Sequence, residues 1–187
     1  EFAMLTPSPL PRTLAAAIRD STHKRLEVRV SAVRDLGRLG EGEHRQSALE
    51  TLARVLQKDE AIAVRCEALL ALADARAREH IDAVIRAASD DLPRIRQMAL
   101  VALGELATMD DRRACEVLEA GLGAEEPAIR FQALVALHHV AKDEIMPSVI
   151  AALEDEDDHV RYVALRIAEE QWLKNGTEPV ATELLTA

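Results

Sequence analysis

The sequence predicts an all-α protein, an α-solenoid of about five helix-turn-helix repeats, and two observations support this prediction. The first is a Val/Ile-Arg pair that recurs five times in 187 residues, at intervals of 36, 31, 34 and 31 residues. The second is that alanine follows each arginine by three residues and Val or Leu follows it by four. The five arginines are Arg29, Arg65, Arg96, Arg130 and Arg161. Each interval accommodates two helices and two turns, so each repeat is predicted to be a helix pair that stacks on the next pair.

Apolar periodicity places both helices of each pair. Apolar residues occur 12 and 8 positions before the later arginines, for example Val84 and Ala88 before Arg96. Residues four positions apart lie on one face of a helix, so these pairs indicate the first helix of each repeat. Acidic residues and prolines such as Pro93 and Pro127 then mark the start of the next helix. The first helices are predicted at 11–21, 44–57, 78–88, 111–122 and 144–154. The second helices are predicted at 27–39, 61–76, 93–107, 127–141 and 158–174.

The corresponding repeats are predicted at 11–40, 43–76, 78–107, 111–141 and 144–174. Residues 1–10 are expected to form a proline-containing lead-in, in which the residues ahead of Met4 are interpreted as a cloning remnant. Residues 175–187 are expected to cap the last repeat or to begin a sixth one.

The repeat pattern resembles the HEAT repeat family, particularly the bacterial HEAT-like repeats of phycobilisome lyases. The similarity is clearest in LEDEDDHVRYVAL at residues 153–165 and LGAEEPAIRFQAL at residues 122–134, where Leu, an acidic turn, Val/Ile-Arg and Ala-Leu follow in order. The resemblance implies a right-handed solenoid with the first helices on the convex side and the second helices lining the concave side. It also implies that the five arginines form a structural ladder between repeats rather than an anion site. Candidate partners for the ladder are Asp59, Asp90, Asp155 and Asp157.

An offset counts residues from the repeated arginine of each second helix, so equivalent positions in all five helices have the same offset. Offsets −1, +3, +4 and +7 are apolar or small and share one face, so the opposite face carries offsets +1, +2, +5, +8 and +9. Apolar residues on that opposite face are predicted to form a partner-binding stripe along the concave surface. The stripe comprises Cys66, Leu70, Met98, Val101, Phe131, Val135 and Tyr162. The alternative is that packing between successive second helices buries offsets +1 and +5.

Glutamates near the stripe favour a partner segment with leucines and interspersed basic residues, that is, an amphipathic basic segment. These glutamates are Glu67, Glu105, Glu169 and Glu170. Residues 1–60 hold 10 basic and 9 acidic residues, whereas residues 61–187 hold 13 basic and 24 acidic residues. The net charge of −10 is therefore concentrated after residue 60. A duplex-binding protein needs a basic surface, so nucleic acid is not an expected partner.

The sequence offers no convincing enzyme, metal or cofactor site. No His-Glu dipeptide of the type used by HEAT-like di-iron hydroxylases occurs, and the adjacent His138 and His139 diverge by ~100° on a helix. The acidic run at 154–158 lacks the glycine and distal glutamate of a calcium loop and is interpreted as a turn and helix cap. The two cysteines, Cys66 and Cys115, suggest neither a disulfide framework nor a metal site.

The predicted function is therefore a non-catalytic protein-protein interaction module, an adaptor or regulatory subunit, which binds a partner on its concave face. No apolar run approaches the ~20 residues that span a bilayer, and no leader is apparent, so a cytoplasmic bacterial protein without membrane contact is expected. The alternative is a phycobilin-lyase-like or cofactor-handling protein. A homo-oligomer formed through the stripe or through the last repeat is a further alternative.

Overall fold

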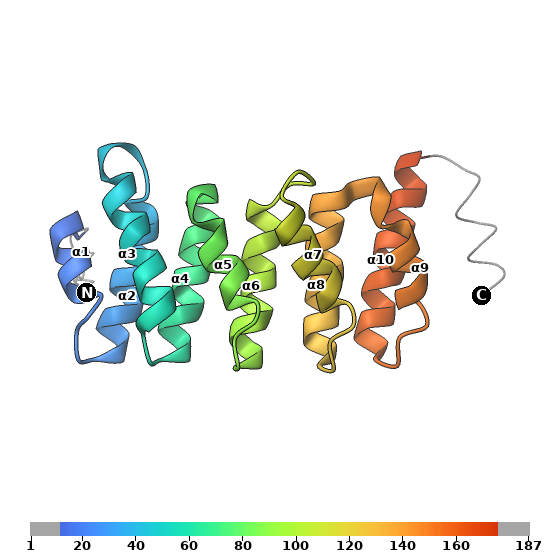
Figure 1. Cartoon of the computed structure of the whole chain (residues 1–187), viewed down its shortest axis with the longest axis horizontal. Coiled ribbons are helices and arrows are strands. Elements are labelled where there is room, and N and C mark those ends of the chain that lie inside the picture. Colours follow the sequence, from blue (N-terminus) through green and yellow to red (C-terminus); the bar gives the residue numbers. More distant parts are fainter. Residues whose placement is uncertain (1–11, 176–187) are drawn as a thin grey trace, which may run out of the picture.

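Five helix pairs follow one another along the long axis of the molecule in a computed structural model that describes residues 12–175 (Figure 1). That part of the chain contains no β-strand. The first helices are α1 (Leu14–Asp20), α3 (Arg45–Lys58), α5 (Ile81–Ala87), α7 (Arg112–Gly121) and α9 (Met146–Ala152). The second helices are α2 (Leu26–Arg38), α4 (Ile62–Asp74), α6 (Pro93–Leu106), α8 (Pro127–Ala141) and α10 (Asp158–Asn175). The predicted all-α solenoid is confirmed.

Helix boundaries follow local chemistry. The Thr13 hydroxyl caps α1 by accepting the Ala16 N–H at 3.3 Å. Pro93 and Pro127 occupy the first positions of α6 and α8, where a missing N–H costs no helical hydrogen bond. The predicted lead-in at 1–10 and the predicted cap beyond Asn175 lie outside the described residues.

The clearest difference from the predicted helices lies in three short 3₁₀ segments. They precede α3, α5 and α9, at Gly42–His44, Arg78–His80 and Lys142–Ile145 respectively. Because these segments take up residues at the start of the predicted first helices, α5 and α9 are each only 7 residues long.

The core lies between the two rows of helices. The alanine at offset +3 is completely buried in every repeat, and offset +7 is buried throughout. These alanines are Ala32, Ala68, Ala99, Ala133 and Ala164. A Cβ built on Gly121 of α7 would lie 2.9 Å from the Ala133 Cβ, so the helices of this pair meet at the +3 position. The small residue is therefore needed where the helices approach most closely.

Successive second helices also pack closely. A Cβ added to Gly104 of α6 would lie 3.0 Å from both the Cα and the Cβ of Ala136 in α8, and Gly37 of α2 meets Ala71 of α4 in the same way. The second helices contact one another much more extensively than the first helices do. This closer packing of the second helices agrees with the concave side predicted for them, and their face is called the concave side from here on. None of the described helices combines the length and apolar character needed to cross a bilayer.

Gly104 offers a direct test of this contact. The Gly104→Val substitution should lower the free energy of unfolding by about 1–3 kcal/mol, because the new side chain collides with the Ala136 backbone rather than with a mobile side chain. The measurement is chemical denaturation followed by circular dichroism. The matched control is Gly123→Ala, whose Cβ has no neighbour nearer than 3.8 Å. Equal stability of Gly104→Val and the wild type would contradict the close contact.

Candidate protein-binding surface

Four of the five repeated arginines connect the turns of neighbouring repeats. Arg130 donates from Nε and Nη2 to the two carboxylate oxygens of Asp155, both at 2.8 Å. Its Nη1 donates to the carbonyl oxygens of Ala124 and Glu125 in its own turn, at 2.8 and 2.9 Å. Arg29 binds Asp59 in the same bidentate way, at 2.8 and 3.2 Å. Each of these arginines therefore joins its own turn to the turn of the next repeat.

Arg65 pairs with Asp90 and Arg96 with Glu126, so four of the five arginines reach an acidic residue of the following repeat. Glu126 was not among the partners expected from the sequence. Arg161 differs, because its Nη1 donates only to the carbonyl oxygens of Asp155 and Glu156, at 2.7 and 2.9 Å. Asp157, expected to join the ladder, instead caps α10 by accepting the N–H groups of His159 and Val160.

The carboxylates also organise the turns in which they lie. Asp155 accepts the backbone N–H of Asp157, Asp59 accepts that of Ala61, and Asp90 accepts that of Leu92. The hydrogen bond from Arg130 holds the pKa of Asp155 below its ordinary value of 3.8, although partial burial opposes this shift. Partial burial also opposes ionisation of Asp90, but the bonds from Arg65 and the Leu92 N–H outweigh it and lower the pKa of Asp90.

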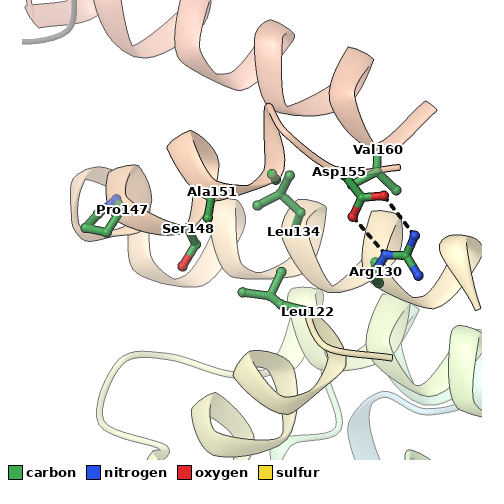
Figure 2. A pocket seen from close by; sticks show the side chains of 9 residues that line it. Leu122, Arg130, Leu134, Pro147, Ser148, Ala151, Asp155 and Val160 are labelled. Carbon is green, nitrogen blue, oxygen red and sulfur yellow. Dashed lines mark hydrogen bonds and ion pairs between the residues drawn. The ribbon is translucent and has the colours of Figure 1, made fainter. Parts of the chain in front are cut away.

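A cavity of about 340 Å³ lies beside the Arg130–Asp155 pair (Figure 2). Leu122, Leu134, Pro147 and Ala151 are among the side chains that line it, and the ion pair closes one end. The cavity lies where α9 diverges from α7. The polar groups of the ion pair beside it already bind one another.

The predicted concave stripe is partly exposed. Leu70 is 37% exposed, and Cys66, Val101, Phe131 and Val135 are half-buried. Packing between second helices therefore covers part of offsets +1 and +5, and the remainder faces the concave side.

The placement of Met98 in the stripe was wrong. Met98 is 8% exposed and belongs to the core. It occupies offset +2, the same offset as Glu67, and Glu67 receives two hydrogen bonds from Arg34 of α2 at 2.7 and 3.0 Å. Offset +2 therefore faces the preceding second helix and not the concave surface.

Tyr162 is the most exposed member of the predicted stripe, at 63%. Its equivalent Phe131 is half-buried, because α10 follows α8 whereas no described helix follows α10. The exposure of Tyr162 thus reflects its place in the last repeat as well as its offset.

Acidic side chains gather along one edge of the concave side, at offset +9 near the ends of the second helices. Asp74, Glu105 and Glu170 occupy this offset in α4, α6 and α10. The glutamates are about half exposed, and Asp74, which the sequence reading missed, is exposed. Glu67 is engaged by Arg34, and Glu169 pairs with Arg166 on the same helix. The acidic edge therefore loses Glu67 and Glu169 from the predicted set and gains Asp74, while Glu170, which it keeps, also pairs with Lys174 of the same helix.

A hollow of about 350 Å³ opens between α2 and α4 on this side. Leu70 and Ala71 form part of its apolar lining, and Arg38 and Asp74 contribute charge. Such a hollow has room for one apolar side chain of a bound segment, with charged groups beside it.

Comparison with known proteins agrees with this geometry. The family model for HEAT repeats matches residues 49–137, and the model for the PBS lyase HEAT-like repeat matches residues 28–58. Together the matches run from residue 28 to residue 137, which is more than half of the chain. The chain belongs to the HEAT repeat family. Among curated proteins, none matches the sequence.

Several solved structures share the HEAT-type fold of this chain. The complex of CpcE and CpcF of phycocyanin lyase from Nostoc sp. PCC7120 has a TM-score of 0.67 at 23% identity, covering 82% of this chain and 96% of that chain. An engineered protein has a TM-score of 0.60 at 21% identity, covering 93% and 89%. A designed armadillo repeat protein in complex with the peptide (KR)4 has a TM-score of 0.58 at 17% identity, covering 92% and 96%. Identities this low establish the fold alone.

A second set of arginines joins these HEAT repeats at the opposite ends of the helices, and the sequence reading missed it. Arg45 donates to the carbonyl oxygens of Gly40 and Ala75 at 2.8 and 2.9 Å, and it also pairs with Glu79. Arg78 donates to the Leu106 carbonyl oxygen at 2.8 Å and pairs with Asp111. Because Arg45 and Arg78 are one repeat apart in the sequence, the repeat interval was a signal that could have revealed them.

The adjacent His138 and His139 do not converge on one site. His138 lies 3.3 Å from Glu170 of α10, whereas His139 lies 3.7 Å from Glu105 of α6, so the two rings address different neighbouring helices. Asp157, Asp158 and His159 form the one cluster with metal-ligand character in the described part of the chain. The cap that Asp157 provides to α10 accounts for this arrangement.

The two cysteines are half-buried free thiols. Burial raises the pKa of Cys66 and that of Cys115, which keeps both sulfurs protonated and weakly nucleophilic at neutral pH.

The arginine ladder predicts unequal effects of equivalent substitutions. Arg130→Ala should lower the free energy of unfolding by about 3–5 kcal/mol, because it leaves the mostly buried Asp155 carboxylate without its partner. Arg161→Ala should cost only about 1 kcal/mol, since the exposed Arg161 binds carbonyl groups alone. Urea denaturation measures both values. Equal losses in the two variants would contradict the importance of the inter-repeat pair.

Acid should weaken the same pair. The pKa of Asp155 is lower in the folded protein than its ordinary value of 3.8, so the unfolded chain binds more protons as the pH falls through that value. The stabilisation is complete above this pH and is lost below it. Asp155→Asn should therefore be less stable than the wild type at neutral pH, and the difference should shrink below about pH 4. Urea denaturation across this range tests the sign, and a difference independent of pH would contradict it.

Proposed function

We propose that this HEAT array is a non-catalytic protein-interaction module, an adaptor or regulatory subunit, which binds a segment of another protein on the face formed by its second helices. The observation that carries the proposal is the apolar row at offset +5. Leu70, Val101 and Val135 remain partly accessible on successive helices, at positions where solvent contact alone favours polar residues.

The surface fits an extended or helical apolar segment. The row follows the array from α4 to α8, and the hollow between α2 and α4 provides a place for one inserted side chain. An amphipathic helix presents apolar residues at intervals of three and four positions, which suits a row of shallow contacts.

The acidic edge supports a basic partner. Asp74, Glu105 and Glu170 all lie to one side of the apolar row, so basic residues on one flank of an amphipathic segment would complement them. Arg94 of α6 lies toward the other edge of the concave side, where it would repel a basic residue. A partner segment with basic residues on both flanks is therefore disfavoured. A designed armadillo protein of similar fold is found with the basic peptide (KR)4, and this precedent supports the same partner chemistry.

The cofactor-handling alternative has less support. The similarity to phycocyanin lyase subunits is a similarity of the repeat scaffold, at 23% identity. A cofactor carried covalently on this chain would need a reactive thiolate, but burial raises the pKa of Cys66 and of Cys115. Visible absorbance of the protein purified after co-expression with bilin synthesis would support that alternative instead.

A display library of helical peptides tests the proposed surface. Leucines are fixed on one face and the flanking positions vary among Lys, Glu, Gln and Ser. Selection should enrich peptides with lysine on one flank. Leu70→Lys and Glu105→Lys should each weaken binding of the selected peptides roughly tenfold, because the first puts a charge into the apolar row and the second sets a positive charge against the basic flank. Fluorescence anisotropy measures the change.

Two matched variants serve as controls for peptide binding. Leu92 is 38% exposed, close to the 37% of Leu70, but it lies in the turn before α6. Glu119 is an exposed acid on the first helix α7. Leu92→Lys and Glu119→Lys should bind as the wild type does. Selection of acidic peptides, or equal losses in the controls, would contradict the proposed surface.

A further inference from the structure

The outer flank of α10 is apolar and uncovered by any other described residue. Its large side chains are 44–77% exposed, and counted along the helix they fall within one face about 120° wide. They are Tyr162, Leu165, Trp172 and Leu173. Arg166 and Glu169 lie on the same face, with exposed side chains that pair with each other at 2.7 Å.

Equivalent flanks of the earlier second helices are repeat–repeat contacts. Offset +4 is at most 2% exposed in the first four repeats, at Val33, Leu69, Leu100 and Leu134. The same offset in α10 is Leu165, and it is 44% exposed. Gly104, at offset +8 of α6, likewise contacts Ala136 of α8, and Glu169 occupies that offset in α10. The α10 flank therefore has the composition of an interface and nothing among the described residues to cover it.

We propose that this flank binds a second copy of the chain, with the two α10 helices antiparallel about a two-fold axis. The order of residues along the flank is self-complementary. An antiparallel pair centred between Arg166 and Glu169 sets Arg166 of each copy opposite Glu169 of the other copy. It also sets Tyr162 opposite Leu173, and every contact occurs twice, as a closed isologous interface requires.

Charge specifies the register of this pair. A shift that centres the pair on Glu169 sets two like charges against each other, which disfavours that arrangement. In the proposed register the two Arg–Glu contacts lie at the centre with Leu165 beside them, and Tyr162, Trp172 and Leu173 lie toward the ends. Aromatic side chains are enriched in the energetically dominant parts of interfaces, so Tyr162 and Trp172 are suited to this position.

The self-association is independent of the proposed binding of a peptide on the concave side. The concave row is centred on Leu70, Val101 and Val135 in α4 to α8, whereas the flank belongs to α10 alone. Tyr162 and Arg166 border both surfaces, and Glu170 of the acidic edge lies on the same helix as the flank. A failure of peptide binding would therefore leave the dimer proposal in place, and the reverse holds as well.

Sedimentation equilibrium of the full chain over a range of concentrations tests the proposal. The wild type should dimerise. Leu173→Glu should shift it toward monomer, because it sets a carboxylate against Tyr162 of the other copy, whereas Leu92→Glu should remain as dimeric as the wild type. Leu173 is 77% exposed, so its substitution should leave the fold intact, which circular dichroism verifies.

Charge reversal tests the register itself. Arg166→Glu and Glu169→Arg should each weaken dimerisation roughly tenfold or more, because each sets like charges opposite each other twice. An equimolar mixture of the two variants should dimerise again, since opposite charges then meet at both contacts, and native mass spectrometry identifies the heterodimer. A wild type that stays monomeric, or a mixture that does not dimerise, would overturn the proposal. Deletion of residues 176–187 that converts a monomeric chain into a dimer would also overturn it, by showing that the chain's own C-terminal segment occupies the flank.

Discussion

The contact on which the stacking of repeats depends is the arginine that joins its own turn to an acidic residue of the next turn. A single helix pair cannot bury its apolar face alone, so the array is stable only if each repeat docks in the correct register on its neighbour. Burial of Ala, Val and Leu supplies most of the free energy, but apolar contact tolerates sliding. The bidentate Arg130–Asp155 pair has a fixed geometry, and it therefore selects one register among several of similar apolar area.

The fold could be predicted from the sequence because its strongest signals are local. The alanine at offset +3 and the prolines at the first positions of α6 and α8 act within one or two turns, and the interval between arginines repeats this local pattern every 31 to 36 residues. Parts of the concave surface could not be predicted, because exposure depends on the neighbouring helix. The sequence pattern places Met98 and Leu70 on the same exposed face of the second helices, but the structure buries Met98 in the core and leaves Leu70 37% exposed. An offset gives the direction in which a side chain points from its own helix, but it does not show whether a neighbouring helix covers that side chain.

In the last described repeat, the offset alone again does not predict the exposure of a residue. Arg161, Tyr162 and Leu165 occupy the offsets of residues that are paired or buried in earlier repeats, yet no described repeat follows to cover them. Identical offsets therefore have a different environment in the last described repeat, which has no described repeat beside it to cover its outer flank. The exposed residues of α10 therefore form one flank, which is distinct from the concave row on α4 to α8.

Close packing of the second helices also limits what the concave side can recognise. Contacts such as Gly104 with Ala136 bring the helices together, and the accessible side chains between them are of moderate size, such as Val101 and Val135. Outside the hollow beside Leu70, a partner of the proposed kind would therefore contact this surface mainly through side chains rather than through an enclosed backbone. Shallow apolar contact discriminates poorly between sequences, so selectivity has to come from charge. The acids at offset +9 lie along one edge only, which distinguishes the two directions and the two flanks of a bound segment.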